Sequence, residues 1–204
     1  MAIQLHIQLR GVSNPSVWRR VVIPDTFTFR QMHFSIQLAF DWQLQHLYQF
    51  QQQPYDQGWC IGEAEVEGRS PFFDSNMQSA KSLNVHEFIE QHQLQQFVYL
   101  YDFGDDWVHD IQVEQLTEEA LKTPRCLDGE GATPPENSGG PMSYEHLKQI
   151  LVKPRKTQAE KQLLQWALMM TRRPFSPDAF FLEYTQKRLR YFKSFEKQVD
   201  DIYD

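Results

Sequence analysis

Three histidines are the residues of this sequence most able to carry out chemistry. His33 falls on the apolar face of an expected helix, and His46 and His109 fall on the aromatic sides of expected strands. Two or three neutral imidazoles with one carboxylate could bind zinc or iron, or could transfer protons near neutral pH. They could also be structural groups that hydrogen-bond to backbone or carboxylate, and this interpretation is favoured. The nearby carboxylates are those of Asp41, Asp102, Asp105, Asp106 and Glu136.

His109 is expected to be the most consequential of these histidines. In the expected strand 107–114, alternation places His109 on the same face as Trp107 and Ile111. A polar ring that points into the core must find a partner or incur a desolvation cost of about 1 to 3 kcal/mol. Asp102 is the expected partner, because a hairpin turn brings the two strand ends together. If a metal binds, the candidate ligands are His46, His109 and Asp102.

The sequence contains no complete catalytic or cofactor-binding motif. Asp102-Phe103-Gly104 matches the magnesium-binding triplet of protein kinases, but the other kinase motifs are missing. His86-Glu87 begins like a zinc-protease helix, yet Glu90 stands where the second histidine should be. The two cysteines, Cys60 and Cys126, are far apart and belong to no CxxC pair. We therefore expect no cofactor, and the motifs leave an enzymatic activity open.

Charge is distributed unevenly along the chain. The net charge of −7 combines 9 basic and 20 acidic residues in 1–151 (net −11) with 11 basic and 7 acidic residues in 152–204 (net +4). The acidic part would repel a phosphate backbone, so nucleic-acid binding is expected to be weak and confined to the C-terminal part. A strand places Trp18 and Arg20 on one face and Arg19 on the other, which dilutes that basic cluster. Further basic residues lie on an expected C-terminal helix: Lys187, Arg188, Arg190, Lys193 and Lys197.

Composition predicts a globular chain with one main core. The 204 residues are 41% hydrophobic and 23% charged, which is typical of folded proteins and not of disordered ones. No window approaches the roughly 18 consecutive apolar residues of a membrane helix, and the N-terminus has no signal-peptide pattern. We therefore expect a cytoplasmic protein with no membrane partner.

The pattern of apolar residues predicts an α+β fold with a mixed or antiparallel sheet, packed by helices. Residues 3–9 alternate and residues 17–23 are rich in β-branched side chains, which predicts two antiparallel strands. Thr28 and Gln31 form a capping-box pattern that should begin a helix. This hairpin-plus-helix start resembles a β-grasp unit in topology only. Further strands are expected at 46–50, 59–61, 97–101 and 107–114, with a short helix at 85–93.

The last third of the chain is predicted to be mainly helical. Residues 124–142 are rich in proline and glycine and are expected to form a long irregular loop. Ser143 should cap a helix to about Leu151, a second helix should follow, and Ser176 and Pro177 should open a third. Pro154 interrupts the helices. We therefore predict an α+β domain over 1–152 and a helical extension over 153–204 that packs on the same domain.

Several blocks, kept in order, resemble a known family. They are Pro15-x-Val17-Trp18-Arg19-Arg20, the segment from His33 through Asp41-Trp42 and His46-Leu47 to Phe50, and the segment from Tyr101-Asp102-Phe103-Gly104 to His109. Cys126-x-x-Gly129, Pro134-Pro135-Glu136, Gly139-Gly140 and Tyr144 continue the match. Over roughly residues 3–152, the sequence is similar to the plasmid pRiA4b open-reading-frame-3-like family.

This resemblance implies an association with plasmids or mobile elements and no particular activity. Members are labelled as passengers of insertion elements or as resolvase-like TnpR proteins. A serine recombinase needs a nucleophilic serine framed by arginines, whereas Ser13 and Ser16 lie in an expected turn. Relatives carry three cysteines where this chain has Cys126, Thr133 and Ser138. Any thiolate metal site inferred for them therefore cannot operate here unchanged.

Three function hypotheses remain open from the sequence alone. The first is a non-enzymatic module that binds a small molecule or a protein in an aromatic-lined groove beside the 124–142 loop. The second is a metal-assisted or acid-base hydrolase that uses His46, His109, Asp102 and Glu136, which would have to converge in one pocket. The third is accessory nucleic-acid binding through the basic C-terminal helix. The candidate pocket residues are Trp18, Arg20, His33, His46, Asp102, Asp106, Trp107, His109 and Glu136.

Overall fold

Alternating residues build the two N-terminal strands as predicted. In the computed structural model, which describes residues 1–63, 77–169, 171 and 175–203, β1 (Ala2–Leu9) pairs antiparallel with β2 (Trp18–Pro24). Ile3, Leu5 and Ile7 are buried in the core, whereas the intervening polar residues are partly or fully exposed on the other face. The predicted hairpin is confirmed.

The first helix, α1 (Phe29–Phe40), begins at the predicted capping box. The hydroxyl of Thr28 accepts the Gln31 N–H at 3.3 Å, and the Gln31 side chain accepts the Thr28 N–H at 3.0 Å. The helix ends at Asp41, whose backbone is left-handed with φ 61°. Because this conformation stops the helix abruptly, the chain turns back toward the sheet immediately after α1.

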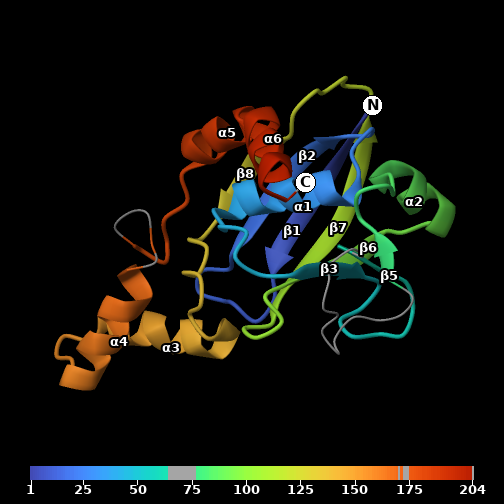
Figure 1. The fold of residues 1–204 in the computed structure, drawn as a ribbon. Helices are drawn as coiled ribbons and strands as arrows, with labels where there is room; N and C mark the ends of the chain where they lie inside the picture. Colours follow the sequence, from blue (N-terminus) through green and yellow to red (C-terminus); the bar gives the residue numbers. More distant parts are fainter. Residues whose placement is uncertain (64–76, 170, 172–174, 204) are drawn as a thin grey trace.

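One sheet contains all eight described strands, in the order β5-β4-β3-β6-β7-β1-β2-β8 (Figure 1). Every neighbouring pair is antiparallel except β4 with β5. This is the α+β class with a mostly antiparallel sheet that the sequence predicts. The remaining strands are β3 (Tyr48–Gln51), β4 (Cys60–Gly62), β5 (Met77–Ser79), β6 (Gln96–Tyr101), β7 (Trp107–Thr117) and β8 (Arg125–Glu130), and α2 (Val85–His92) precedes β6.

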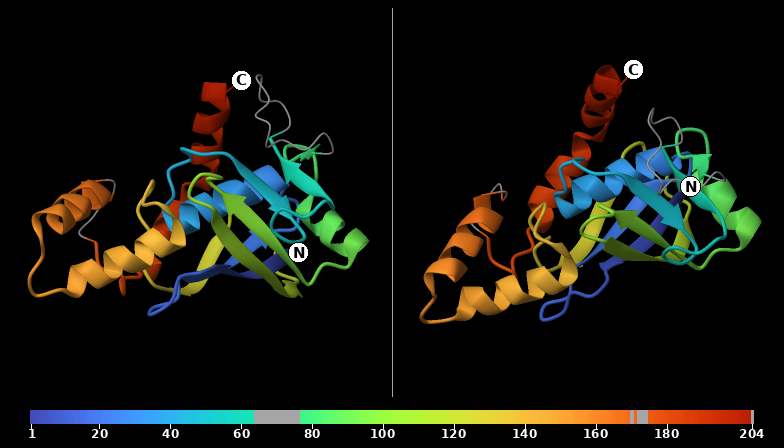
Figure 2. Two further views of the ribbon diagram at one scale, coloured as in Figure 1. Left: turned by 90° about the horizontal axis from the view of Figure 1, so that it is seen from below. Right: turned by 60° about the horizontal axis from the view of Figure 1, so that its bottom comes forward.

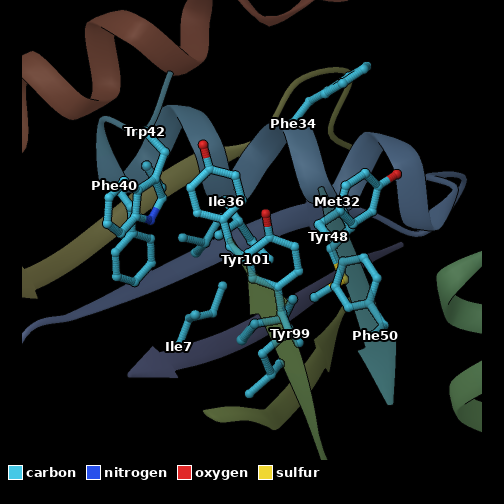
Figure 3. Packing of buried hydrophobic residues seen from close by; sticks show 14 of the residues in the cluster. Ile7, Met32, Phe34, Ile36, Phe40, Trp42, Tyr48, Phe50, Tyr99 and Tyr101 are labelled. Carbon is cyan, nitrogen blue, oxygen red and sulfur yellow. The ribbon is translucent and has the colours of Figure 1, made fainter. Parts of the chain in front are cut away.

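The main core lies between α1 and one face of the sheet. Figure 3 shows aromatic rings of β3 and β6, among them Tyr48, Tyr99 and Tyr101, gathered beneath α1. On its other side α1 contacts two C-terminal helices, α5 (Leu182–Arg190) and α6 (Phe192–Tyr203). The described helices also include α3 (Gly140–Val152) and α4 (Gln158–Met169), which extend from one end of the sheet (Figure 2). None of the helices in the described ranges is long and apolar enough to cross a membrane.

Three predicted element boundaries are wrong. Residues 124–142 are not wholly irregular, because Arg125–Glu130 form β8, an edge strand that tolerates Asp and Gly since it pairs on one side only. Helix α3 begins at Gly140, with Gly139 as N-cap and Pro141 in the first turn, instead of at Ser143. A third difference concerns His46: β3 begins at Tyr48, because the Gln45 N–H bonds to the hydroxyl of Tyr101 and not to a strand partner.

The predicted third C-terminal helix also differs from the structure. It does not open at Ser176 and Pro177, where the Ala132 N–H donates to the Pro177 carbonyl at 2.8 Å and holds the segment against the preceding loop. The helix begins at Leu182 instead and is interrupted at Tyr191, which separates α5 from α6.

Residues from both predicted parts of the chain contribute to one hydrophobic cluster. Tyr144 and Leu147 come from the range 1–152, and Ala167, Leu189 and Phe192 come from the range 153–204. Phe27 stacks on Phe192 with ring centroids 4.9 Å apart, and Phe34 meets Phe195 edge-on at 5.7 Å. The division into a domain and a separable extension stays a prediction.

Candidate functional site

Three segments that are distant in sequence meet at His46. This residue lies in the short loop between α1 and β3, and its Nε2 is 3.2 Å from Oδ2 of Asp102 and 3.8 Å from Oε2 of Glu136. Neither contact is an aligned hydrogen bond, so both are electrostatic pairings. Nε2 is fully enclosed, whereas 25% of the side chain is exposed, so the exposed part belongs to the other ring atoms.

The turn between β6 and β7 presents Asp102 to His46. Asp102 has a left-handed backbone with φ 57°, and its Oδ1 accepts the N–H groups of Gly104 at 3.0 Å and Asp105 at 3.3 Å. These bonds fix the carboxylate and leave Oδ2 directed at His46. The Asp102 N–H also donates to the carbonyl of Leu47 at 3.0 Å, which joins the turn to the His46 loop.

Glu136 supplies a second, more deeply buried carboxylate. Its side chain is 2% exposed, and Oε1 accepts the Gln43 N–H at 2.7 Å and the Tyr101 hydroxyl at 3.0 Å. Oε2 has no hydrogen bond within the described residues. Burial raises the pKa of Glu136, although the bonds from Gln43 and Tyr101 and the nearby His46 oppose this shift. The site therefore contains a carboxyl group that holds its proton more tightly than an exposed glutamate does.

Tyr101 connects the sheet to both sides of the site. Its hydroxyl accepts the Gln45 N–H at 3.1 Å and donates to Glu136. Burial, reinforced by the charge of Glu136, raises the pKa of Tyr101 far above its usual value, so the phenol stays neutral and serves as a donor. The ring also packs edge-on against His46, with centroids 5.7 Å apart. Sequence reasoning did not select Tyr101, although its place at the end of an aromatic strand beside Asp102 was a usable signal.

His33 lies in α1 above the same aromatic strands. Its Nδ1 is 2.7 Å from the hydroxyl of Tyr99, which also accepts a bond from Gln37 at 3.0 Å. The imidazole stacks on Tyr48 with centroids 3.5 Å apart and an interplanar angle of 4°. Burial lowers the pKa of His33 well below its usual value. The ring is therefore neutral and accepts the proton of Tyr99, and Gln37 in turn bonds the N–H of Leu44 at 2.9 Å.

A cavity of about 410 Å³ opens beside these two histidines. Its walls come from α1, the His46 loop, β3 and α6, and most of its lining is apolar. The polar groups that reach it are few, which is the usual composition of a small-molecule site. The lining residues are Arg30, His33, Phe34, Leu44, His46, Leu47, Tyr48, Glu63, Lys81 and Val199.

His109 points into the core as predicted, but its expected partner is wrong. The Trp42 indole N–H donates to Nε2 of His109 at 3.3 Å, and Nδ1 lies 3.2 Å from the carbonyl of Trp107. Asp102 is directed at His46 instead, because its left-handed backbone turns the side chain away from the strand. Trp107 is also fully buried, and its indole nitrogen has no partner in the part of the chain described.

The remaining candidate residues lie elsewhere. Arg20 pairs with Glu114 at 2.8 Å on the face of the sheet opposite α1, and Trp18 stacks on His6 there with centroids 5.0 Å apart. Asp106 accepts the hydroxyl of Tyr55 at the outer end of the β6–β7 turn. Of the nine candidates, the cluster at His46 therefore contains Asp102 and Glu136, and His33 shares its cavity.

The candidate metal ligands do not form a coordination site. Among the described residues, no group of three or more His, Cys, Asp or Glu side chains is placed to hold a metal ion. His109 is enclosed by Trp42, Phe40 and Tyr99, on the other side of the aromatic layer from the Asp102 carboxylate. The geometry at His46 accordingly favours proton transfer and hydrogen bonding.

Arg19 is a buried cation that sequence reasoning left on a solvated edge. All of its N–H groups are bonded: Nε to the Ala39 carbonyl at 3.1 Å, Nη1 to Trp18 and Glu130 carbonyls, and Nη2 to the Gly131 carbonyl and the Thr133 hydroxyl. Burial lowers the pKa of Arg19 to about 10, so it remains charged at neutral pH. Arg19 thereby joins β2 and the C-terminal end of α1 to the loop that carries Glu136.

Comparison with known proteins agrees with this arrangement. Residues 1–183 match the family described as plasmid pRiA4b ORF-3-like protein. The chain belongs to this family. Its match continues past residue 152, through the linker and the first residues of α5.

Two relatives illustrate how far this similarity extends. The uncharacterized protein y4hQ of Sinorhizobium fredii (strain NBRC 101917 / NGR234) is 32% identical over 166 residues, which cover 80% of this chain and 79% of that protein. The crystal structure of MM3350 from Methanosarcina mazei Go1, titled a protein of unknown function, is similar with a TM-score of 0.71 and 26% identity. That match covers 89% of this chain and 96% of the other.

Proposed function

We propose that this protein is a non-enzymatic binding module for a small ligand with an apolar body and one polar group. The binding site is the cavity beside His46. The observation that supports this proposal is the position of the His46 ring, which lines an apolar cavity with one edge and faces two buried carboxylates with the other. An imidazole held in this way is a pre-positioned hydrogen-bonding group.

The chemistry of the lining sets the kind of ligand. Phe34, Leu44, Leu47 and Val199 offer apolar contacts, which favour an aromatic or aliphatic body. A proton on Nε2 of His46 is favoured by Asp102 and Glu136, so Nδ1 of the neutral ring is the acceptor. A hydroxyl or amide N–H on the ligand suits that acceptor.

A second candidate function is acid-base hydrolysis at the same place. The feature that favours it is the pairing of one imidazole nitrogen with two carboxylates, since such an arrangement stabilises the charged ring formed when histidine accepts a proton. Of the four residues first considered, His46, Asp102 and Glu136 meet, and His109 lies apart in the core. The lining carries no serine, threonine or cysteine, so hydrolysis here would require an activated water.

The binding test uses two probes that differ by one hydroxyl group. We expect 2-naphthol to bind more tightly than naphthalene, and we expect this preference to disappear in His46→Ala while both probes still bind. Saturation-transfer NMR and the histidine ring signals report the binding. His92→Ala, which removes an exposed histidine of α2, is the matched control.

The two probes also separate the candidates. Equal binding of both probes to wild type and to His46→Ala would contradict the proposed polar contact. Binding that displaces no ring signal of His46 would place the site elsewhere. Turnover of p-nitrophenyl acetate that is lost in His46→Ala but kept in His92→Ala would favour the hydrolase instead.

A further inference from the structure

Helices α3 and α4 form a protruding arm with an exposed apolar stripe. Figures 1 and 2 show both helices extending away from α5 and α6. Ala167 is buried against the core, but Leu163, Trp166 and Met169 are exposed on the other side of α4. Their spacing of three residues keeps them on one side of the helix. Trp166 is 50% exposed and Met169 74% exposed, which is unusual for side chains of this size.

The tip of the arm is basic. The segment that joins α3 to α4 and the first turn of α4, residues 152–161, contain four basic side chains and one acidic one. Lys153 pairs with that acidic residue, Glu160, at 2.5 Å, and Lys156 bonds the carbonyls of Leu151 and Lys153. Arg155 and Lys161 are exposed. The tip therefore presents positive charge to solvent.

The root of the arm is acidic. Helix α3 starts against the β6–β7 turn, where the Gly139 N–H donates to Oδ2 of Asp105 at 2.8 Å. The next residue, Asp106, is exposed at the same turn and contacts Tyr55, whose loop also carries Asp56. Negative charge thus lies at one end of the arm and positive charge at the other.

This distribution is complementary to itself under a twofold rotation. Helix α3 has 13 residues and so spans about 20 Å at 1.5 Å per residue. If two arms lie antiparallel, the basic tip of each reaches the acidic root of the other, and the same contact occurs twice. The apolar stripes of the two α4 helices then cover one another between these charged ends.

We propose that the arm formed by α3 and α4 docks onto the arm of a second copy of this chain to give a twofold dimer. Neither partner needs a ligand in the His46 cavity, so this association is independent of the function proposed above. The apolar stripe supplies the buried contact, and the charged ends set the antiparallel direction and exclude a parallel one.

Sedimentation equilibrium over a concentration series tests this proposal directly. We expect a monomer–dimer equilibrium whose dissociation constant rises with ionic strength. Trp166→Asp should raise that constant on the order of tenfold or more, because it puts a charge in the covered stripe. Arg155→Glu and Asp106→Asn should each raise it by a smaller factor. Lys187→Glu, the same type of charge change at an exposed position of α5, should leave it unchanged.

Three results would overturn the proposal. The first is a wild-type chain that stays monomeric up to millimolar concentration. The second is a dimer whose dissociation constant is the same in Trp166→Asp and Arg155→Glu as in wild type, since the contact would then lie on another surface. The third is growth beyond the dimer, because it indicates a head-to-tail contact. Circular dichroism of each variant verifies that the helices are retained.

Discussion

The indole N–H of Trp42 donates to Nε2 of His109 at 3.3 Å and ties the segment after α1 to the middle of the sheet. Because Nδ1 of His109 faces the carbonyl of Trp107 at 3.2 Å, that nitrogen carries the proton and Nε2 is the acceptor. Burial lowers the pKa of His109 to about 4. The ring is therefore a neutral structural element of the core.

Stability should depend on pH through His109. Its pKa is about 6.5 in the unfolded chain and about 4 in the folded one, so between these values the unfolded state binds more protons. The stabilisation is fully present above pH 6.5 and is lost as the pH falls toward 4. A shift of this size corresponds to a loss on the order of 3 kcal/mol. His33, whose pKa burial also lowers, contributes in the same direction.

Replacement of His109 by glutamine isolates this contribution. Glutamine can accept the Trp42 N–H but cannot titrate, so the slope of unfolding free energy against pH should fall by about one proton between pH 6.5 and 4. Urea unfolding at a series of pH values measures that slope. The control is His92→Gln, at an exposed position of α2. A slope equal to that of wild type would show that His109 is already protonated in the fold.

Local patterns predicted much of the fold, and long-range contacts account for most of what they missed. The capping box at Thr28 and the hairpin around Gly104 depend on neighbouring residues, so the sequence is sufficient for them. The burial of Arg19 depends on carbonyls of Glu130 and Gly131, which become neighbours only when β8 pairs with β2. No spacing rule along the chain could identify that pairing.

The candidate site was predicted in part for the same reason. His46, Asp102 and Glu136 were selected by residue type, yet their grouping results from one helix end, one turn and one loop that converge. Strand alternation suggested that Asp102 would meet His109. It failed because alternation ends where the strand ends, and the left-handed backbone of Asp102 redirects the carboxylate. The hydroxyl of Tyr101, which bridges the parts, could not be placed without the sheet register.

Glu136 should oppose folding as the pH rises. Burial raises its pKa in the folded chain above the ordinary value of 4.5, so between those values the folded state binds more protons. The stabilisation by its protonated form is present at low pH and is lost as the pH rises through the folded pKa. Glu136→Gln cannot ionise. We therefore expect this variant to gain stability relative to wild type at pH 7 compared with pH 4.5.

Chemical denaturation at these two pH values measures the effect of Glu136. The matched control is Glu118→Gln, at an exposed position beyond β7, which should show no such gain. If Glu136→Gln were less stable than wild type by a larger margin at pH 7 than at pH 4.5, the ionised carboxylate would be stabilising. That outcome would reverse the expected sign of the Glu136 contribution.

Arg19 should not tolerate lysine. The guanidinium bonds carbonyls in three directions at once, and a lysine ammonium on a flexible chain cannot reach all of them. We expect Arg19→Lys to lower the free energy of unfolding by about 3 kcal/mol, since buried carbonyls are left unpaired. Arg20→Lys changes a partly exposed ion pair on the opposite face and should cost less than about 1 kcal/mol. Equal losses in the two variants would contradict the structural role of Arg19.

The junction between α3 and the β6–β7 turn requires glycine at position 140. Gly140 has φ 80°, and a Cβ built there would lie 2.5 Å from the carbonyl oxygen of Asp105. Gly140→Ala must therefore both strain the backbone and displace the turn, and we expect a loss of about 1 to 3 kcal/mol. Gly104→Ala, in the same turn, meets only the Asp102 side chain at 3.3 Å and should be far milder. Because that turn also holds Asp102 against His46, Gly140→Ala should shift the His46 ring signals in NMR spectra, whereas unchanged signals together with full stability would show that the two backbones can separate without effect.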